Sequence, residues 1–148
     1  MKAFSFSLQR LLDVKSAVER QSEVELAEAQ KKLQKARRKK EQLEESFKKY
    51  SEVFAKLGGT ADACRELTIQ IKYIHWLEKK IQSQERRIAS SSNEVEERRR
   101  NLVEIMKERK SLERLSEREF EAWQEKSRQQ SRNAMDEIAS TRFQLARD

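Results

Sequence analysis

The sequence predicts an all-α protein: a long two-helix antiparallel coiled-coil hairpin in which the second helix overhangs the first. Three observations indicate this fold class. Of the 148 residues only 2 are Gly and none is Pro, and the turns between strands depend on such residues. Charged residues make up 40% of the chain and hydrophobic ones 36%, which is typical of long helices rather than globular enzymes. Apolar residues also recur at alternating intervals of three and four, the pattern of a coiled-coil seam.

The first predicted helix covers about residues 7–57. Its seam contains a single charged residue and consists of Leu26, Ala29, Leu33, Ala36, Lys40, Leu43, Phe47, Tyr50, Phe54 and Leu57. Upstream, an apolar stripe continues through Leu8, Leu11, Leu12, Val14 and Val18. This stripe joins the seam through Ser22 with an extra four-residue step, which predicts a stutter in the coiled coil.

The adjacent glycines Gly58 and Gly59 predict the turn of the hairpin. Glycine directly after the last seam residue is a common helix stop. Thr60 or Asp62 can then cap the second helix, which we expect over about residues 61–145.

The second helix repeats the heptad pattern. One row of its seam is apolar and has a strict seven-residue spacing: Ile74, Ile81, Ile88, Val95 and Leu102. The other row becomes increasingly polar along the chain: Leu77, Gln84, Ser91, Arg98 and Ile105. Such a seam fixes the register of the two helices at some cost in stability.

Folding the chain back at the glycines aligns the two seams as one elongated domain, 1–148. The predicted register puts Tyr50 opposite Leu67, and Leu43 opposite Ile74. The second helix then has no partner beyond about residue 110, where it carries Leu112, Leu115, Phe120, Trp123, Met135, Ile138, Phe143 and Leu145. We expect this overhang to contact another protein or to stay partly disordered. A parallel homodimer without a hairpin is the alternative.

The side-chain inventory argues against an enzyme. The one histidine, His75, has no second histidine with which to hold a metal, and Cys64 has no neighbouring base. Two adjacent glycines cannot form a glycine-rich phosphate loop. We therefore predict no catalytic residue, no metal, no cofactor and no small-molecule substrate. No run of about 18 apolar residues occurs, so no membrane-spanning helix is expected.

The net charge of +7 is concentrated in one basic patch: Lys31, Lys32, Lys35, Arg37, Arg38, Lys39 and Lys40. Three interpretations remain open. The patch can follow nucleic-acid phosphates, dock an acidic protein surface, or be offset by acids on the facing helix. A nucleic-acid-binding coiled coil is accordingly the alternative function from another class.

Several apolar residues near the turn lie off the seam, namely Val53, Ile69, Tyr73 and Trp76. Exposed aromatic residues at the end of a hairpin favour a binding surface. The alternative is that these side chains shield the last turns of the seam.

Four segments of the sequence resemble the flagellar export protein FliJ family. They are the opening Phe4-Ser-Phe-Ser-Leu-Gln-Arg-Leu-Leu-Asp13, Glu23–Gln30, Arg118–Glu121 and Met135–Ala139. Each segment is simple by itself, but their order and the long second helix extend the resemblance over essentially the whole chain. YscO-like injectisome proteins are the related alternative.

The resemblance implies a non-enzymatic stalk of the flagellar type III export apparatus, required for flagellum biogenesis and motility. Proteins of this family bind the hexameric export ATPase (FliI-like) and the export gate membrane protein (FlhA-like). They also escort substrate-specific export chaperones. The implied location is the bacterial cytoplasm, peripheral at the inner membrane.

The resemblance also implies two contact regions. Gate contacts fall toward the turn, at Gln42, Tyr73 and Leu77 by position and at Tyr50 and Phe54 with a one-residue shift. Trp76, off the seam beside them, completes the gate candidates. The ATPase contacts would lie at the end that carries the termini, at Leu8, Leu11, Arg109, Phe120 and Trp123.

Overall fold

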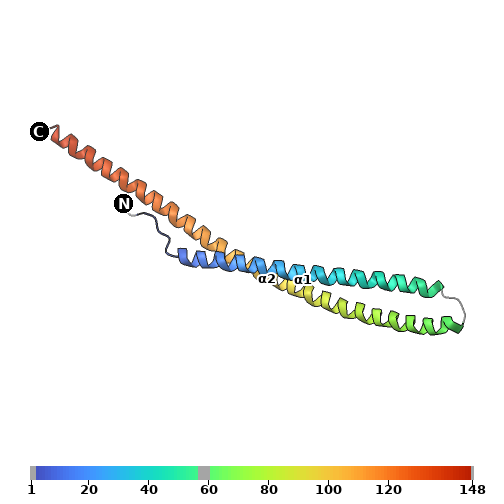
Figure 1. Cartoon of the computed structure of the whole chain (residues 1–148). Coiled ribbons are helices and arrows are strands. Elements are labelled where there is room, and N and C mark those ends of the chain that lie inside the picture. The colour runs from blue at the N-terminus through green and yellow to red at the C-terminus, as the bar shows by residue number, and fades with distance from the viewer. Residues whose placement is uncertain (1–2, 57–60, 148) are drawn as a thin grey trace. The chain divides into compact units, whose positions relative to one another are not determined.

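The computed structural model describes residues 3–56 and 61–147, and the side chains of all of these except residues 61–63. Two helices make up the fold, α1 (Gln9–Lys56) and α2 (Ala61–Leu145), and the described residues form no strand (Figure 1). The predicted all-α class is confirmed. Leu57, the Gly58–Gly59 turn and Thr60 lie outside the described residues. No helix in the described part of the chain has an apolar stretch suited to crossing a membrane.

The contacts divide the chain into two compact units, each built from a stretch of both helices. We call residues 21–102 the hairpin unit. We call residues 1–20 together with 103–148 the terminal unit. The expectation of one elongated domain stays a prediction.

The predicted seam forms the core of the hairpin unit. Ala29, Leu77, Gln84 and Val95 are buried, and the other described seam positions are half-buried while most of their neighbours are exposed. Leu77 is the most deeply buried large side chain, at 1% exposure. The three-four spacing therefore identifies the packed face of both helices.

The two helices run antiparallel in the hairpin unit, but the predicted register is wrong. Tyr50 lies against Tyr73, with ring centroids 4.5 Å apart, and not opposite Leu67. Gln84 donates a hydrogen bond of 3.0 Å to the backbone carbonyl of Ala36. The shift is close to one heptad. Because both seams repeat every seven residues, such a slip brings equivalent rows together again, and the pattern alone cannot distinguish the two registers.

Polar contacts between the helices distinguish the registers where the apolar rows do not. The Arg98 guanidinium donates to Glu25 at 2.7 Å, and Lys40 lies 3.3 Å from Glu85. Glu85, and then Glu44, raise the pKa of the Lys40 ammonium above its ordinary value of 10.5. Polar groups of this kind at seam positions specify register, because a slipped partner would leave them unpaired.

In the terminal unit, the apolar stripe that the sequence placed in the core is exposed. Leu8, Leu11, Val14 and Val18 all face solvent, and of that stripe Leu12 alone is half-buried. The buried position of α1 in this unit is Glu19, at 9% exposure. Burial continues in unbroken heptad phase from Leu26 back through Ser22, Glu19, Lys15 and Leu12, so the predicted stutter is wrong.

The overhang is also shorter than predicted, because the N-terminal segment of the terminal unit lies on α2. The Phe4 ring packs edge-on against Phe120 at 5.2 Å and lies 6.0 Å from Trp123. Phe6 is buried at 6% exposure. Beyond this contact, every described residue from 128 to 147 is exposed.

Candidate functional site

An aromatic face lies on the hairpin unit, where the last turns of α1 meet the first turns of α2. Tyr73 packs edge-on against Tyr50 and stacks on Trp76, with ring centroids 5.6 Å apart. The Lys80 ammonium lies 5.4 Å from the centre of the Trp76 ring. Trp76 is 48% exposed, so half of a large aromatic side chain faces solvent. The contacts hold this side chain in place before any partner binds.

The other gate candidates differ in their access to a partner. Gln42 is exposed and Phe54 is half-buried. Leu77 is buried in the seam, so it cannot touch a partner while the helices remain packed. Val53 and Ile69, the remaining off-seam apolar residues, are exposed, Ile69 at 67%.

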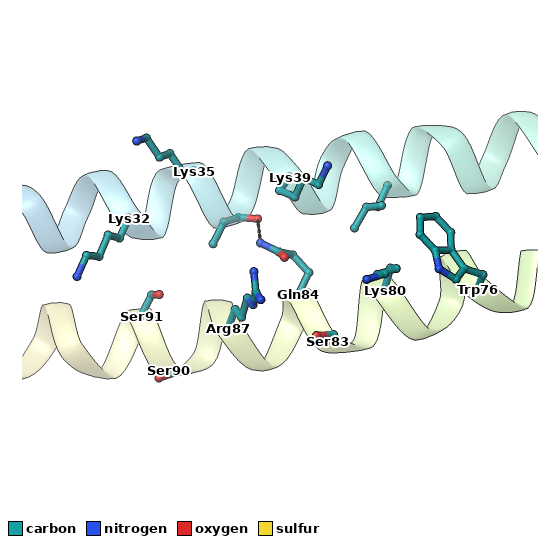
Figure 2. Close-up of a pocket in the computed structure, with 12 residues that line it drawn as sticks. Lys32, Lys35, Lys39, Trp76, Lys80, Ser83, Gln84, Arg87, Ser90 and Ser91 are labelled. Carbon is teal, nitrogen blue, oxygen red and sulfur yellow. Dashed lines mark hydrogen bonds between the residues drawn. The ribbon is translucent and has the colours of Figure 1, made fainter. Parts of the chain in front are cut away.

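The basic patch of the sequence divides between separate surfaces. Lys32, Lys35 and Lys39 line one groove between the helices, together with Lys80 and Arg87 of α2 (Figure 2). Lys31 and Arg37 line a different groove with Arg99. Lys40 lies in the seam and Arg38 is exposed. Residues adjacent in sequence thus face different sides because successive helix positions are about 100° apart.

Acids on the facing helix offset only part of this charge. Lys32 lies 4.0 Å from Glu94, and Lys40 is paired with Glu85. In the described part of the chain, no carboxylate lies within salt-bridge distance of Lys35, Lys39 or Arg87. Acids of the protein therefore neutralise two of the patch residues, Lys32 and Lys40, and the groove remains basic.

A half-buried ion cluster is central to the terminal unit. Arg109 of α2 donates to Glu19 of α1 and, at 2.5 Å, to Glu113. These hydrogen bonds, the one to Glu19 foremost, raise the pKa of Arg109 above its ordinary value. Lys15 and Glu108 form a second ion pair between the helices. Arg109, an ATPase candidate, is thus engaged within the protein and holds the two helices together.

The remaining ATPase candidates fall in two groups. Leu8, which directly precedes α1, and Leu11 of α1 are exposed, and Leu11 is in line with Val14 and Val18. Phe120 and Trp123 stack on each other and are partly covered by Phe4. The sequence argument missed this covering contact. The sequence feature that could have indicated it is the alternation of phenylalanine and serine at the N-terminus, which is unlike a helix and typical of an extended segment.

Neither His75 nor Cys64 contributes to a chemical centre. The His75 ring lies 3.2 Å from Glu78 one helical turn away, and both side chains are exposed. Cys64 is exposed too. Across residues 3–56 and 64–147, no three His, Cys, Asp or Glu side chains gather in a way that could hold a metal ion.

The fold defines a two-helix coiled-coil protein with an exposed aromatic face and a basic groove. The family model described as flagellar FliJ protein matches residues 4–148, so the chain belongs to the FliJ family. Members of this family are components of flagellar export and not known enzymes, and the chain accordingly has a role in flagellar export. No curated protein and no solved structure shows a significant match to the chain.

Proposed function

We propose that this chain is a non-enzymatic stalk and adaptor of the flagellar type III export apparatus. It binds the hexameric export ATPase (FliI-like) through the terminal unit and the export gate (FlhA-like) through the aromatic face of the hairpin unit. It works in the bacterial cytoplasm, at the cytoplasmic face of the inner membrane, and escorts substrate-specific export chaperones. The observation that carries the proposal is the exposed, prepositioned Trp76 on a chain of the FliJ family.

The gate contact is proposed for Trp76 together with Tyr73, Tyr50, Gln42 and Phe54. Half-exposed aromatic side chains contribute most of the binding energy at many interfaces, because they bury a large area at little entropic cost. The contacts with Tyr73 and Lys80 hold Trp76 in place and lower that cost further. Leu77 is buried in the seam and is left out of the proposed contact.

The ATPase contact is proposed for the apolar stripe of the terminal unit, at Leu8 and Leu11. Exposed leucines and valines in a row on one helix are a hydrophobic surface that a partner can cover. Phe120 and Trp123 can join this contact after Phe4 moves away. Arg109 maintains the helix pairing on which the stripe depends.

The gate contact is tested with Trp76→Ala and the purified cytoplasmic domain of the gate protein. We expect binding to weaken at least about tenfold, which corresponds to about 1.4 kcal/mol. Ile71→Ala is the matched control, because Ile71 is exposed on the same segment of α2 but lies about 160° around the helix from Tyr73. Equal affinities for wild type and Trp76→Ala in calorimetry would refute the gate contact.

The ATPase contact is tested separately with Leu11→Ser, by measuring ATP hydrolysis of the export ATPase with and without the chain. We expect stimulation by the wild type and a clear loss of stimulation with the variant. Val24→Ser is the control, because Val24 is also an exposed apolar residue of α1 but belongs to the hairpin unit. Absence of stimulation by the wild type would remove the ATPase from the proposal.

The two alternative functions have less support. The nucleic-acid interpretation relied on one continuous basic patch, and that patch is divided between two grooves and the seam. The match to the flagellar family favours the flagellar system over the YscO-like injectisome.

A further inference from the structure

The basic groove of the hairpin unit has the character of a docking site. It has a volume of about 870 Å³ and lies between α1 and α2, with Lys32, Lys35 and Lys39 on one side and Lys80 and Arg87 on the other (Figure 2). We propose that this groove binds an acidic amphipathic helix of a partner protein. The proposal goes beyond the ATPase and gate contacts, and of the gate candidates the groove includes only Trp76.

The charge of the groove calls for an acidic partner. Five of the residues that line it are cations, and none of the described lining residues is acidic. Lys35, Lys39 and Arg87 have no carboxylate within salt-bridge distance among the described residues, and Lys32 reaches Glu94 only at 4.0 Å. In Figure 2, Lys32 and Arg87 extend toward the space between the helices. An acidic partner would therefore gain contacts without displacing strong internal ones.

Three acids of the hairpin unit face a different groove. A separate groove is lined by Glu44, Glu78 and Glu85. Lys40, the one patch residue in the seam, is paired with two of them. Charges of opposite sign are thus segregated between two grooves. A surface with mixed charge would neutralise itself, whereas the segregated arrangement creates complementary potential for a partner.

The apolar residues of the groove favour a helix over a nucleic acid. Ala36, Leu43 and Trp76 line it between the cations, and Trp76 is half exposed. A phosphate backbone has nothing to bury against alanine and leucine. An amphipathic helix can place its apolar row on these residues and its acidic residues against the cations at either side.

The spacing of the cations matches a helical partner as well. Lys32, Lys35 and Lys39 are three and four residues apart, so they lie on one face of α1. Lys80 and Arg87 are seven apart on α2, which also puts them on one face. The lining from Lys32 to Leu43 extends about 18 Å along α1, which accommodates about three turns of a third helix.

The test uses the full chain and a peptide library that favours neither acidic nor basic residues. A display library of helical peptides of about 20 residues carries apolar residues at heptad seam positions, with Asp, Glu, Lys, Arg, Gln and Ser randomised elsewhere. Peptides selected on the wild-type chain should be rich in Asp and Glu beside the apolar row. Their affinity should fall as salt is raised from about 50 to about 200 mM, because the contacts are charged and exposed.

The matched variants separate the groove from net charge. The triple variant Lys35→Glu, Lys39→Glu, Arg87→Glu should bind the selected peptides at least about tenfold more weakly. The control variant reverses three cations of the neighbouring groove: Lys31→Glu, Arg37→Glu and Arg99→Glu. It changes the net charge by the same amount and should bind the selected peptides as tightly as the wild type does. Circular dichroism of the helical signal checks that both variants are folded. A variant with glutamine at Lys35, Lys39 and Arg87 removes the same charges without reversing them.

Four outcomes would overturn the proposal. The library can yield no binder, or it can yield binders with no acidic preference. The two triple variants can lose affinity equally, in which case only net charge matters. Finally, a single-stranded oligonucleotide of about 20 bases can bind the wild-type chain more tightly than the best peptide does. If the first triple variant no longer binds that oligonucleotide, the groove is a nucleic-acid site.

Discussion

Leu77→Ala should destabilise the hairpin unit by about 2.5 kcal/mol. Leu77 is 1% exposed and is the largest fully buried side chain in the described part of the chain. The substitution removes three carbon atoms from the seam, and at about 0.8 kcal/mol per buried carbon this loses about 2.4 kcal/mol of transfer free energy. The cavity term should be small, because a two-helix seam lies close to solvent and can partly collapse. The expected loss is therefore near the lower end of the usual range of about 2–5 kcal/mol.

The assay is urea unfolding of the full chain, followed by helical circular dichroism and compared with the wild type at one protein concentration. The matched control is Ile69→Ala, since Ile69 is 67% exposed on the same stretch of α2 and should cost less than about 0.5 kcal/mol. A loss below about 1 kcal/mol for Leu77→Ala would refute the reasoning. It would show that Leu77 is not the packed centre of the seam.

Three further predictions concern other contacts. Ile81→Asp should unfold the hairpin unit, because it adds a carboxylate to the seam beside the groove lined by Glu44, Glu78 and Glu85. Trp76→Ala should instead leave the helical signal and the melting temperature nearly unchanged, because Trp76 is half exposed. Equal losses in circular dichroism would make Trp76 part of the core. The stability that Lys40 contributes should be complete below about pH 10.5 and lost as the pH rises through the raised pKa of its ammonium, since Glu85 and Glu44 favour the charged form. The melting temperatures of wild type and Lys40→Gln should therefore converge as the pH rises from about 10.5 to about 12, and a constant difference would contradict this pairing. Phe4→Ala should expose Trp123 and shift tryptophan emission to the red by comparison with Phe4→Leu, and an unchanged spectrum would mean that Phe4 does not cover it.

The candidate surfaces could be predicted from the sequence only in part. The exposure of Trp76 could be predicted because it lies off both seam rows, and its off-seam position follows directly from helical geometry. The basic groove was not recognisable, because Lys80 and Arg87 belong to it through the pairing of α2 with α1. Leu77 shows the opposite case. Its position matched the contact face of the family, but its side chain is buried in the core.

The terminal unit departs furthest from the sequence argument. Leu11, Val14 and Val18 were expected in the core because apolar residues usually are. The structure leaves them exposed and buries Glu19, which Arg109 of the other helix pairs. A buried carboxylate is tolerable where a guanidinium reaches it, and this compensation lies 90 residues away along the chain.

The scarcity of glycine and proline and the three-four spacing of apolar residues determined by themselves that the chain forms two long helices packed along a seam. These are local properties, because backbone freedom and helical periodicity act over a few residues. The tertiary structure alone decided the register, the exposure of the stripe at Leu11 and the contact of Phe4 with Phe120. A seven-residue repeat fits its partner almost equally well after a slip of one heptad, so side-chain pairs such as Arg98 with Glu25, formed between distant parts of the chain, select the register.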